Sequence, residues 1–280
     1  MNTEDNSPKG LSRRDFFKGS AFVTVGLVSG GFLANYKMPE FFTMRLTQEK
    51  TLYQLTLMPL IFPVNCYLIE EENGLTLIDA ALSFGFKDIL KASEKMDKPI
   101  TKIVLTHAHG DHIGALDQLK QTLKDVPVYV SQRESRLMSG DTTLDADEDN
   151  LPVKGSVPKN LLTRADVLVK DGDQIGSLLV VSAPGHTPGS TAYLDTRNNI
   201  LIVGDAFQVR GGLAVAGQIR PLFPFPALAT WNKKAALESA HKLRNLDPSV
   251  LATGHGNILV NPLKAMDEVI AQAENALKSK

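Results

Sequence analysis

The sequence contains a single cysteine, Cys66, among 280 residues, and its formal net charge is only −1. One cysteine excludes an internal disulfide and any cysteine-rich zinc module. Without an excess of basic residues the chain lacks the charge that binding to a phosphate backbone requires, so nucleic acid is not an expected partner. The content of 43% apolar and 22% charged residues is that of a globular protein with a full core. Cys66 stands in the apolar stretch VNCYLIE and is predicted to be a buried structural thiol.

The N-terminal segment differs from the rest of the chain. Residues 1–18 are polar, residues 19–34 carry no charge, and this order is typical of an export signal. Within it, SRRDFFK, which contains Arg13 and Arg14, resembles a twin-arginine signal. The uncharged run is short for a membrane span of roughly 20 residues, so both cleavage and retention as an anchor stay open. We expect residues 1–40 to be a signal or an N-terminal anchor, read by the twin-arginine machinery, that sends the body across a bacterial membrane.

Residues 48–280 are predicted to form one domain in which strand-like and helix-like stretches alternate. The strand-like stretches are TLYQLTLM, NCYLIE, LTLIDA, TKIVLT, PVYVS, DVLVK, LLVVSAP, STAYLD, NILIVGD and SVLAT. Apolar residues recur at helical spacing in 86–96, 112–124, 229–245, which contains Trp231, and 261–279. An α/β sandwich of two sheets with helices outside (αββα) accounts for this order. A single doubly wound sheet would give nearly the same pattern.

One stretch of the body lacks any such period. Residues 139–163 carry a cluster of acidic residues between two strand-like stretches. A loop of this length inside a compact domain is usually functional or mobile.

The motif THAHGDH follows the strand-like stretch TKIVLT and gathers three imidazoles and a carboxylate. If the extended backbone continues beyond Thr106, the rings of His107 and His109 project to the same side. Asp111 and His112 follow where the chain turns toward the next helix. Ligand-type side chains at the carboxyl end of a buried strand lie where an α/β protein places its chemistry.

Three further ligand-type residues stand in the same local setting. His186 follows the strand-like LLVVSAP in a turn rich in Pro and Gly, Asp205 ends NILIVGD, and His255 stands between two glycines after SVLAT. The recurrence of such a residue at the end of a strand predicts that they converge on one site. His241, the remaining histidine, stands in a helical stretch and is expected at the surface.

Together, the HxHxDH motif, the GHTPG loop, the Gly-Asp pair and the C-terminal GHG resemble the metallo-β-lactamase superfamily over roughly residues 51–260. The resemblance implies the αββα fold and two zinc ions. By similarity, His107, His109 and His186 hold one ion, Asp111, His112 and His255 hold the other, and Asp205 bridges them. The resemblance also assigns Asp79 a supporting role without metal binding.

The ligand types agree with this implication. Nitrogen and carboxylate ligands without thiolate suit zinc, and could also hold manganese or iron. Three ligands for each metal and one bridge leave positions for water, which two metals activate together. The resulting hypothesis is a hydrolase in which a bridging hydroxide attacks an ester, lactone or thioester carbonyl, and catalytic Asp111 orients it and returns a proton to the leaving group.

The substrate stays open, because this fold carries many reactions. The commonest zinc β-lactamases have Cys at the position of Asp205 and Lys three residues later, where this chain has Gln208, and phosphodiesterases acting on tRNA have a basic arm that is not visible here. The chain is more similar to small lactonases and esterases. The alternatives kept open are a β-lactamase, a phosphodiesterase, a single-iron oxygenase acting on persulfides, and a non-catalytic exported metal-binding domain.

Two segments are candidates for the walls of a small-molecule substrate site. One is LIFPVN (60–65), and the other is the irregular segment 206–227. In the second, four residues could line an acyl pocket or pack the loop onto the body: Phe207, Leu213, Phe223 and Phe225. Arg210 and Arg220 could meet a carboxylate or phosphate of the substrate or remain solvated.

Overall fold

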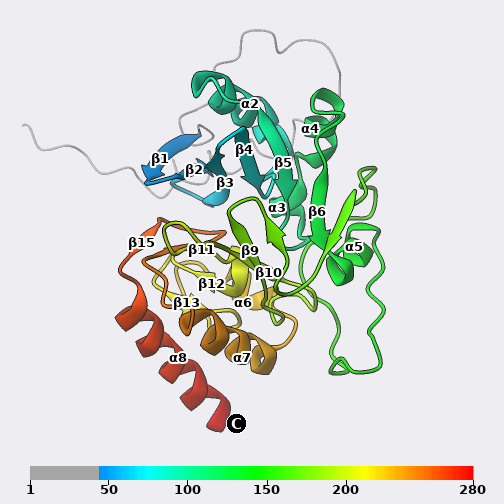
Figure 1. Cartoon of the computed structure of the whole chain (residues 1–280). Coiled ribbons are helices and arrows are strands. Elements are labelled where there is room, and N and C mark those ends of the chain that lie inside the picture. The colour runs from blue at the N-terminus through cyan, green and yellow to red at the C-terminus, as the bar shows by residue number, and fades with distance from the viewer. Residues whose placement is uncertain (1–43, 280) are drawn as a thin grey trace, which may run out of the picture. The chain divides into compact units, whose positions relative to one another are not determined.

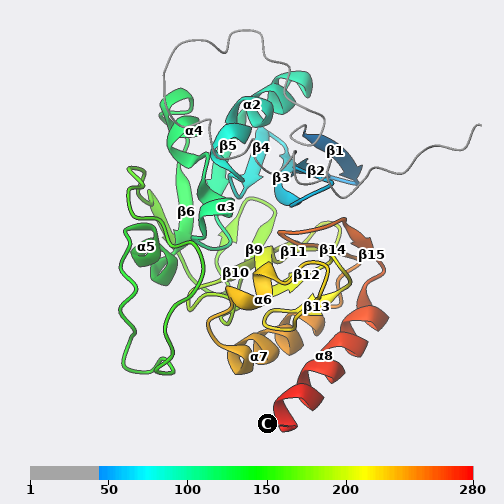
Figure 2. The ribbon, with the colours of Figure 1, turned by 180° about the vertical axis from the view of Figure 1, so that it is seen from behind.

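The computed structural model describes residues 44–279, all of which belong to one unit of the chain. The predicted signal, residues 1–40, lies outside the described residues. Within the described part, no helix combines the length and the apolar character that a membrane crossing requires. Two β-sheets lie face to face, and helices cover the outer face of each (Figure 1, and from behind in Figure 2).

The first sheet contains seven strands in sequence order. Strands β1 to β4 pair antiparallel and β4 to β7 pair parallel. The strands are β1 (Arg45–Glu49), β2 (Leu52–Leu57), β3 (Val64–Glu71), β4 (Gly74–Ile78), β5 (Ile100–Val104), β6 (Val128–Ser131) and β7 (Val167–Val169).

The second sheet contains six strands in the order β15-β14-β11-β10-β9-β8. All its pairs are antiparallel except β11 with β14. Its strands are β8 (Gln174–Ile175), β9 (Leu178–Ser182), β10 (Thr191–Asp195), β11 (Ile200–Ile202), β14 (Val250–Ala252) and β15 (Leu259–Val260). A separate two-stranded ribbon joins β12 (Phe207–Gln208) to β13 (Ala214–Val215).

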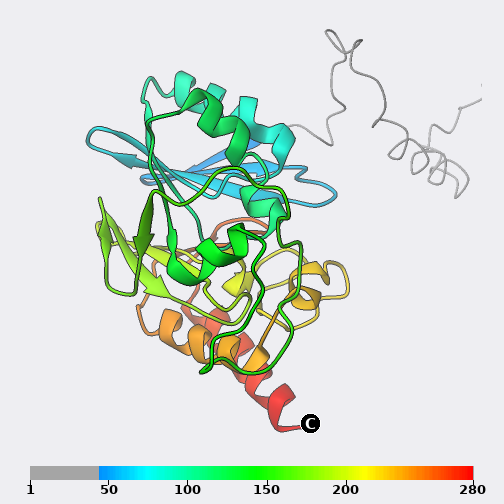
Figure 3. The same ribbon diagram turned by 90° about the vertical axis from the view of Figure 1, so that its right-hand side faces the viewer.

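Helices lie on the outer face of each sheet, and shorter ones lie beside the sheets at mid-height (Figure 3). Those connected to the first sheet are η2 (Ser83–Gly85), α2 (Phe86–Lys95), α3 (Gly110–Ile113), α4 (Leu116–Thr122) and α5 (Gln132–Met138). Those of the second half are η3 (Gly204–Ala206), α6 (Phe225–Leu228), α7 (Lys233–Arg244) and α8 (Leu263–Lys278).

The alternation of side chains along the strands produces this layering. In β3, Cys66 and Leu68 pack into the core beneath the helices, whereas Tyr67 and Ile69 pack into the core between the sheets. In β11, Ile200 and Ile202 likewise face the other sheet, while Leu201 packs under α7 and α8. Because successive side chains of a strand point to opposite faces, fully apolar strands predict burial on both sides. The predicted αββα sandwich is confirmed, and the alternative of a single doubly wound sheet is wrong.

Two predicted helices differ from those observed. The stretch 112–124 is divided into α3 and α4, because the carbonyl of His112 accepts a hydrogen bond from the backbone of Ala80 at 2.6 Å and is not available to continue the helix. Trp231 lies before α7 rather than inside it. Asn232 caps that helix by accepting hydrogen bonds from Lys234 and Ala235, and the indole of Trp231 donates to the carbonyl of Leu151 at 2.8 Å.

The acidic loop 139–163 contains no helix or strand, as its sequence predicts, and arginines of α5 bind three of its acidic residues. Arg133 binds Glu148 at 2.7 Å, and Arg136 binds Asp141 at 3.2 Å and also Asp145. These contacts fix the loop along the side of the domain, where its residues 154–156 reach the site described next.

Candidate metal centre

The structure brings the seven predicted ligands together at the ends of strands from both sheets. His107 and His109 follow β5, Asp111 and His112 belong to α3, and the remaining three follow strands of the second sheet: His186 after β9, Asp205 after β11 and His255 after β14. Potential ligand atoms lie within 4.8 Å of one another in three overlapping groups: His107 with His109 and His186, His107 with His112 and Asp205, and Asp111 with His112 and His255.

In the first group each histidine ring is fixed through one nitrogen and turns the other toward the site. His109 donates from Nε2 to the carbonyl of Lys154 at 2.8 Å, which leaves Nδ1 facing Nε2 of His186 at 2.9 Å. The Nδ1 atoms of His107 and His186 bind threonine hydroxyls at 3.0 and 3.2 Å, respectively. The hydroxyls belong to Thr106 and Thr230.

The second group is oriented in the same way. His112 binds Oδ2 of Asp79 through Nδ1 at 2.8 Å, and His255 donates from Nδ1 to the carbonyl of Pro63 at 2.7 Å. Asp79 in turn accepts hydrogen bonds from the backbone and the hydroxyl of Thr106, both at 2.8 Å. A carboxylate or carbonyl behind a histidine is the usual arrangement that fixes the tautomer of a metal ligand.

Asp205 lies between the two groups and is 4% exposed. Its Oδ1 is 3.5 Å from Nε2 of His112, and its Oδ2 is 3.4 Å from Nε2 of His186 and 3.2 Å from Nε2 of His255. Gly254 makes this approach possible, because a Cβ at that position would lie 2.1 Å from Oδ1 of Asp205 and 2.5 Å from the ring of His112.

The two groups differ in electrostatics. Burial lowers the pKa of His107 and His109 and lowers the pKa of His186 to about 3. Burial also opposes a charge on His112 and His255, but nearby carboxylates, first of all Asp205, raise the pKa of both rings. Burial would raise the pKa of Asp205, yet His255 and His112 hold it well below its usual range. One group therefore offers three neutral rings, and the other pairs two rings with carboxylates.

Three buried polar atoms at this point have no hydrogen-bond partner within residues 44–279: Nε2 of His107, Nε2 of His112 and Oδ1 of Asp205. Buried polar atoms without partners are costly, so such groups normally have a ligand or an ion to bind. All three atoms belong to nitrogen or carboxylate ligands, the donor types that zinc and iron accept. The residues present therefore fit a pair of metal ions.

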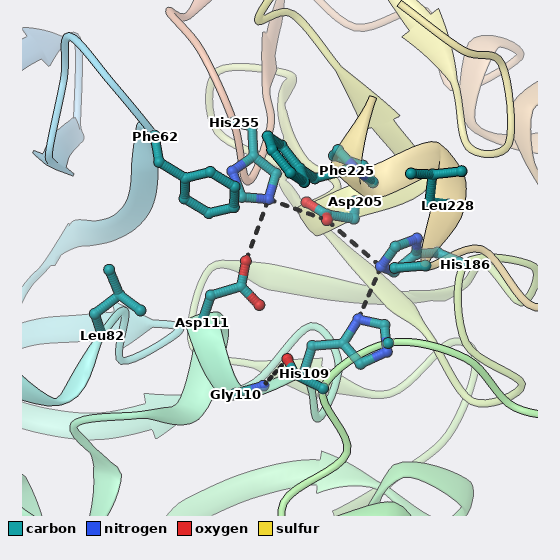
Figure 4. A pocket seen from close by; sticks show the side chains of 14 residues that line it. Phe62, Leu82, His109, Gly110, Asp111, His186, Asp205, Phe225, Leu228 and His255 are labelled. Atoms are coloured by element: carbon teal, nitrogen blue, oxygen red, sulfur yellow. Dashed lines mark hydrogen bonds and ion pairs between the residues drawn. The ribbon is translucent and has the colours of Figure 1, made fainter. Parts of the chain in front are cut away.

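The centre lies at the bottom of a cavity of about 590 Å³ (Figure 4). His109, Asp111, His186, Asp205 and His255 line it, together with Gly110, Gly155 and Ser156. Its other lining residues are apolar: Phe62, Leu82, Phe225, Pro226, Leu228 and Ala229. Gly155 must be glycine, because it has φ +88° and a Cβ there would lie 2.3 Å from Nε2 of His109.

Glu134 of α5 was not predicted from the sequence, although it joins the two loops that carry the first group. Its carboxylate accepts hydrogen bonds from the backbone of Ala108 at 2.8 Å and of Gly189 at 2.9 Å, and from the hydroxyl of Thr187 at 2.6 Å. Ser131 caps α5 and accepts from the backbone of Glu134, so the spacing S-x-x-E signals a helix start. That signal does not reveal where the carboxylate points.

The other residues singled out in the sequence lie as follows. Phe62, within the predicted LIFPVN wall, and Phe225 line the cavity, whereas Phe207 and Phe223 are fully buried behind it. Leu213 packs against the core under α7 and α8 instead of lining the cavity. Cys66 is buried as a free thiol, and burial raises its pKa. His241 is half-exposed and pairs with Glu274.

Of the two roles left open for Arg210 and Arg220, contact with a substrate anion is not supported by their positions. Arg210 donates to the carbonyl of Leu60 at 2.9 Å, and Arg220 donates to the carbonyl of Leu213 at 3.0 Å. Neither side chain lines the cavity.

Comparisons with known proteins agree with this geometry. Residues 60–255 match the model of the metallo-beta-lactamase superfamily. YobT of Bacillus subtilis is 54% identical over 82% of this chain and 99% of its own length. "Probable metallo-hydrolase YflN" of the same organism is 30% identical over 69% of this chain and 80% of its own length. The crystal structure of TTHA1623 in a di-iron-bound form is 29% identical, covers 76% of this chain and 96% of its own, and gives a TM-score of 0.57. The chain belongs to the metallo-β-lactamase superfamily.

Proposed function

We propose that the protein is a hydrolase with a pair of metal ions that cleaves a carboxylic ester, lactone or thioester. One observation carries the proposal: seven ligand-type side chains from both sheets converge, with three unpartnered buried polar atoms among them, at the bottom of a cavity large enough for a small molecule. The presence of all seven ligand-type side chains argues against the alternative of a non-catalytic domain with the same fold.

His107, His109 and His186 would hold one ion, and Asp111, His112 and His255 the other, with Asp205 between them. When bound, two such ions would lower the pKa of a shared water toward ~7 and polarise the carbonyl that it attacks. Asp111 lines the cavity, and its Oδ2 lies 3.5 Å from Nε2 of His255. It can therefore orient the attacking water by accepting a proton, and return that proton to the leaving group. Zinc suits the donor set, and the di-iron form of the relative TTHA1623 makes iron the alternative.

The alternatives with anionic substrates receive less support. Among residues 44–279 no lysine or arginine lines the cavity, whereas phosphodiesters and β-lactams carry a negative charge that such a residue would bind. Gln208, at the position where the commonest zinc β-lactamases have Lys, is 3% exposed and donates to the backbone of Arg210 and Phe223. It supports the loop and does not face the substrate.

The test combines metal analysis with turnover. The purified full chain is expected to hold about two zinc or iron ions and to hydrolyse members of a panel of esters, lactones and thioesters. Removal of the metal by a chelator should reduce the rate by at least ~100-fold, and added metal should restore it. A protein that holds its metals but cleaves no carbonyl compound would contradict the proposal. Cleavage of only phosphodiesters or β-lactams would identify one of the alternatives instead.

We also propose that the chain is exported through the twin-arginine route. Four residues separate Arg13 and Arg14 from the uncharged run 19–34, and a route that carries folded proteins allows the metals to be loaded first. Replacement of both residues by lysine is expected to retain the protein in the cytoplasm of a bacterial host, as measured by cell fractionation. Lys18→Arg is the matched control, since it alters a basic residue outside the pair. Unchanged export of the double variant would refute the route.

A further inference from the structure

The cavity above the metal centre has apolar side chains on both sides. Phe62 comes from the loop between β2 and β3, Leu82 follows β4, and Phe225 and Leu228 belong to α6. Figure 4 shows these side chains around the ligands, with Leu82 on the opposite side from Leu228. A substrate held over the metals would therefore contact apolar groups from three separate segments.

The aromatic part of this wall is fixed by mutual packing. The rings of Phe62, Phe223 and Phe225 lie 5.1 to 5.3 Å apart, and Phe223, which is 1% exposed, anchors the other two. Phe62 and Phe223 also pack against the ring of His255, at 5.5 and 5.2 Å. Such aromatic contacts restrict the rings to one arrangement, so the apolar surface begins directly beside a predicted ligand.

Part of this apolar surface remains uncovered. Phe225 is 52% and Leu228 is 61% exposed, although both line the cavity. Exposed large apolar side chains at the entrance of a cavity are typical of a surface that an apolar ligand covers.

The charges around the cavity favour the same kind of ligand. Arg210 and Arg220 are bound to backbone carbonyls elsewhere, and no lysine or arginine within residues 44–279 lines the cavity. An anionic group placed on the apolar wall would lose its hydration without gaining a counter-ion.

We propose that the part of the substrate that does not react is an uncharged, apolar acyl or alkyl group, bound against Phe62, Phe225 and Leu228. This inference rests on the proposed hydrolysis of a carbonyl compound and narrows it to neutral esters and lactones. It excludes thioesters whose carrier bears carboxylates, such as those of glutathione.

The test uses p-nitrophenyl esters, whose reacting groups are identical, with the zinc-loaded full chain. From acetate to octanoate, kcat/KM is expected to rise roughly two- to fourfold per methylene until the cavity is filled. Esters of the same length that end in a carboxylate are expected to react at least ~100-fold more slowly than their neutral counterparts. Equal rates, or a preference for the carboxylated series, would overturn the inference and leave the proposed hydrolysis intact. No turnover of any ester, lactone or thioester would overturn the proposed function.

A pair of variants tests whether the apolar side chains at the cavity entrance cause the preference for neutral esters. Leu228→Lys places a cation at the cavity entrance, where the side chain is already largely exposed and folding should be unaffected. It is expected to raise kcat/KM for the carboxylated esters and to lower it for the neutral ones, which changes their ratio by at least ~10-fold. Leu222→Lys is the matched control, because Leu222 lies shortly before α6 and is 86% exposed but does not line the cavity. If both variants shift the ratio equally, α6 is not the binding wall.

Discussion

Asp205→Ala is expected to leave the protein with fewer than two metal ions and to lower kcat/KM by about 10³-fold or more. The reason is the position of this carboxylate. Within residues 44–279 it is the only one with oxygens within 3.5 Å of histidines from both groups, His112 and His255 on one side and His186 on the other. Its removal would take a negative charge from between the two proposed ions and leave these rings without their central partner. Metal content per chain, chelator competition and kcat/KM for the best ester measure the effect.

The control is a second buried carboxylate that does not touch the centre. Asp195 is fully buried and binds Arg197 at 2.9 and 2.7 Å and the hydroxyl of Thr51 at 2.9 Å. Asp195→Asn should therefore lower the free energy of unfolding without changing the metal content. Full metal content and full activity in Asp205→Ala would remove the basis for a shared, two-ion centre.

The convergence of the seven predicted ligands was predictable because five of them follow apolar strands, and Asp111 and His112 come directly after two of these five in the chain. TKIVL before His107 and NILIVG before Asp205 have the composition of strands buried on both faces. Strands of this kind end at one edge of the sandwich, so the residues that directly follow them lie close together. The sequence alone could thus indicate which side chains converge, because the αββα arrangement of the two sheets was predicted correctly.

The orientation of the ligands was not predictable in the same way. His109 turns Nδ1 toward the site because the carbonyl of Lys154 occupies its other nitrogen, and Lys154 belongs to a loop that has no period in its sequence. The contacts of Arg210 and Arg220 were not predictable for a similar reason, because each side chain binds a backbone carbonyl of an irregular segment. When a side chain binds a backbone carbonyl of an irregular segment, the residue types of that segment do not show it, since every residue has such a carbonyl.

Glu134 is the strongest case of such a hidden contribution, and its replacement gives the second large effect that we expect. The residue is fully buried. Its carboxylate accepts hydrogen bonds from the backbone of Ala108, which lies between His107 and His109. It also accepts from Thr187 and Gly189, which follow His186. Glu134→Ala leaves the buried backbone N–H of Ala108 and the partly buried one of Gly189 without their acceptor, at a cost of about 1–3 kcal/mol for a fully buried group. We expect the free energy of unfolding of the metal-free protein to fall by roughly 3–5 kcal/mol, as measured by urea denaturation.

If Glu134 only stabilises the fold, its replacement lowers the free energy of unfolding and nothing else. If it also positions the predicted ligands, its replacement lowers the metal affinity as well. Because Glu134 fixes the loops of His107, His109 and His186, its loss should weaken binding of the more weakly held ion by about 10- to 100-fold in chelator competition. Glu134→Gln keeps one acceptor oxygen and turns an amide toward a backbone N–H, so it should recover only part of both effects. Asp195→Asn again serves as the comparison, as a variant that is destabilised outside the centre. Equal metal affinity in Glu134→Ala and Asp195→Asn would mean that Glu134 contributes to folding alone, and that the ligand loops keep their geometry without it.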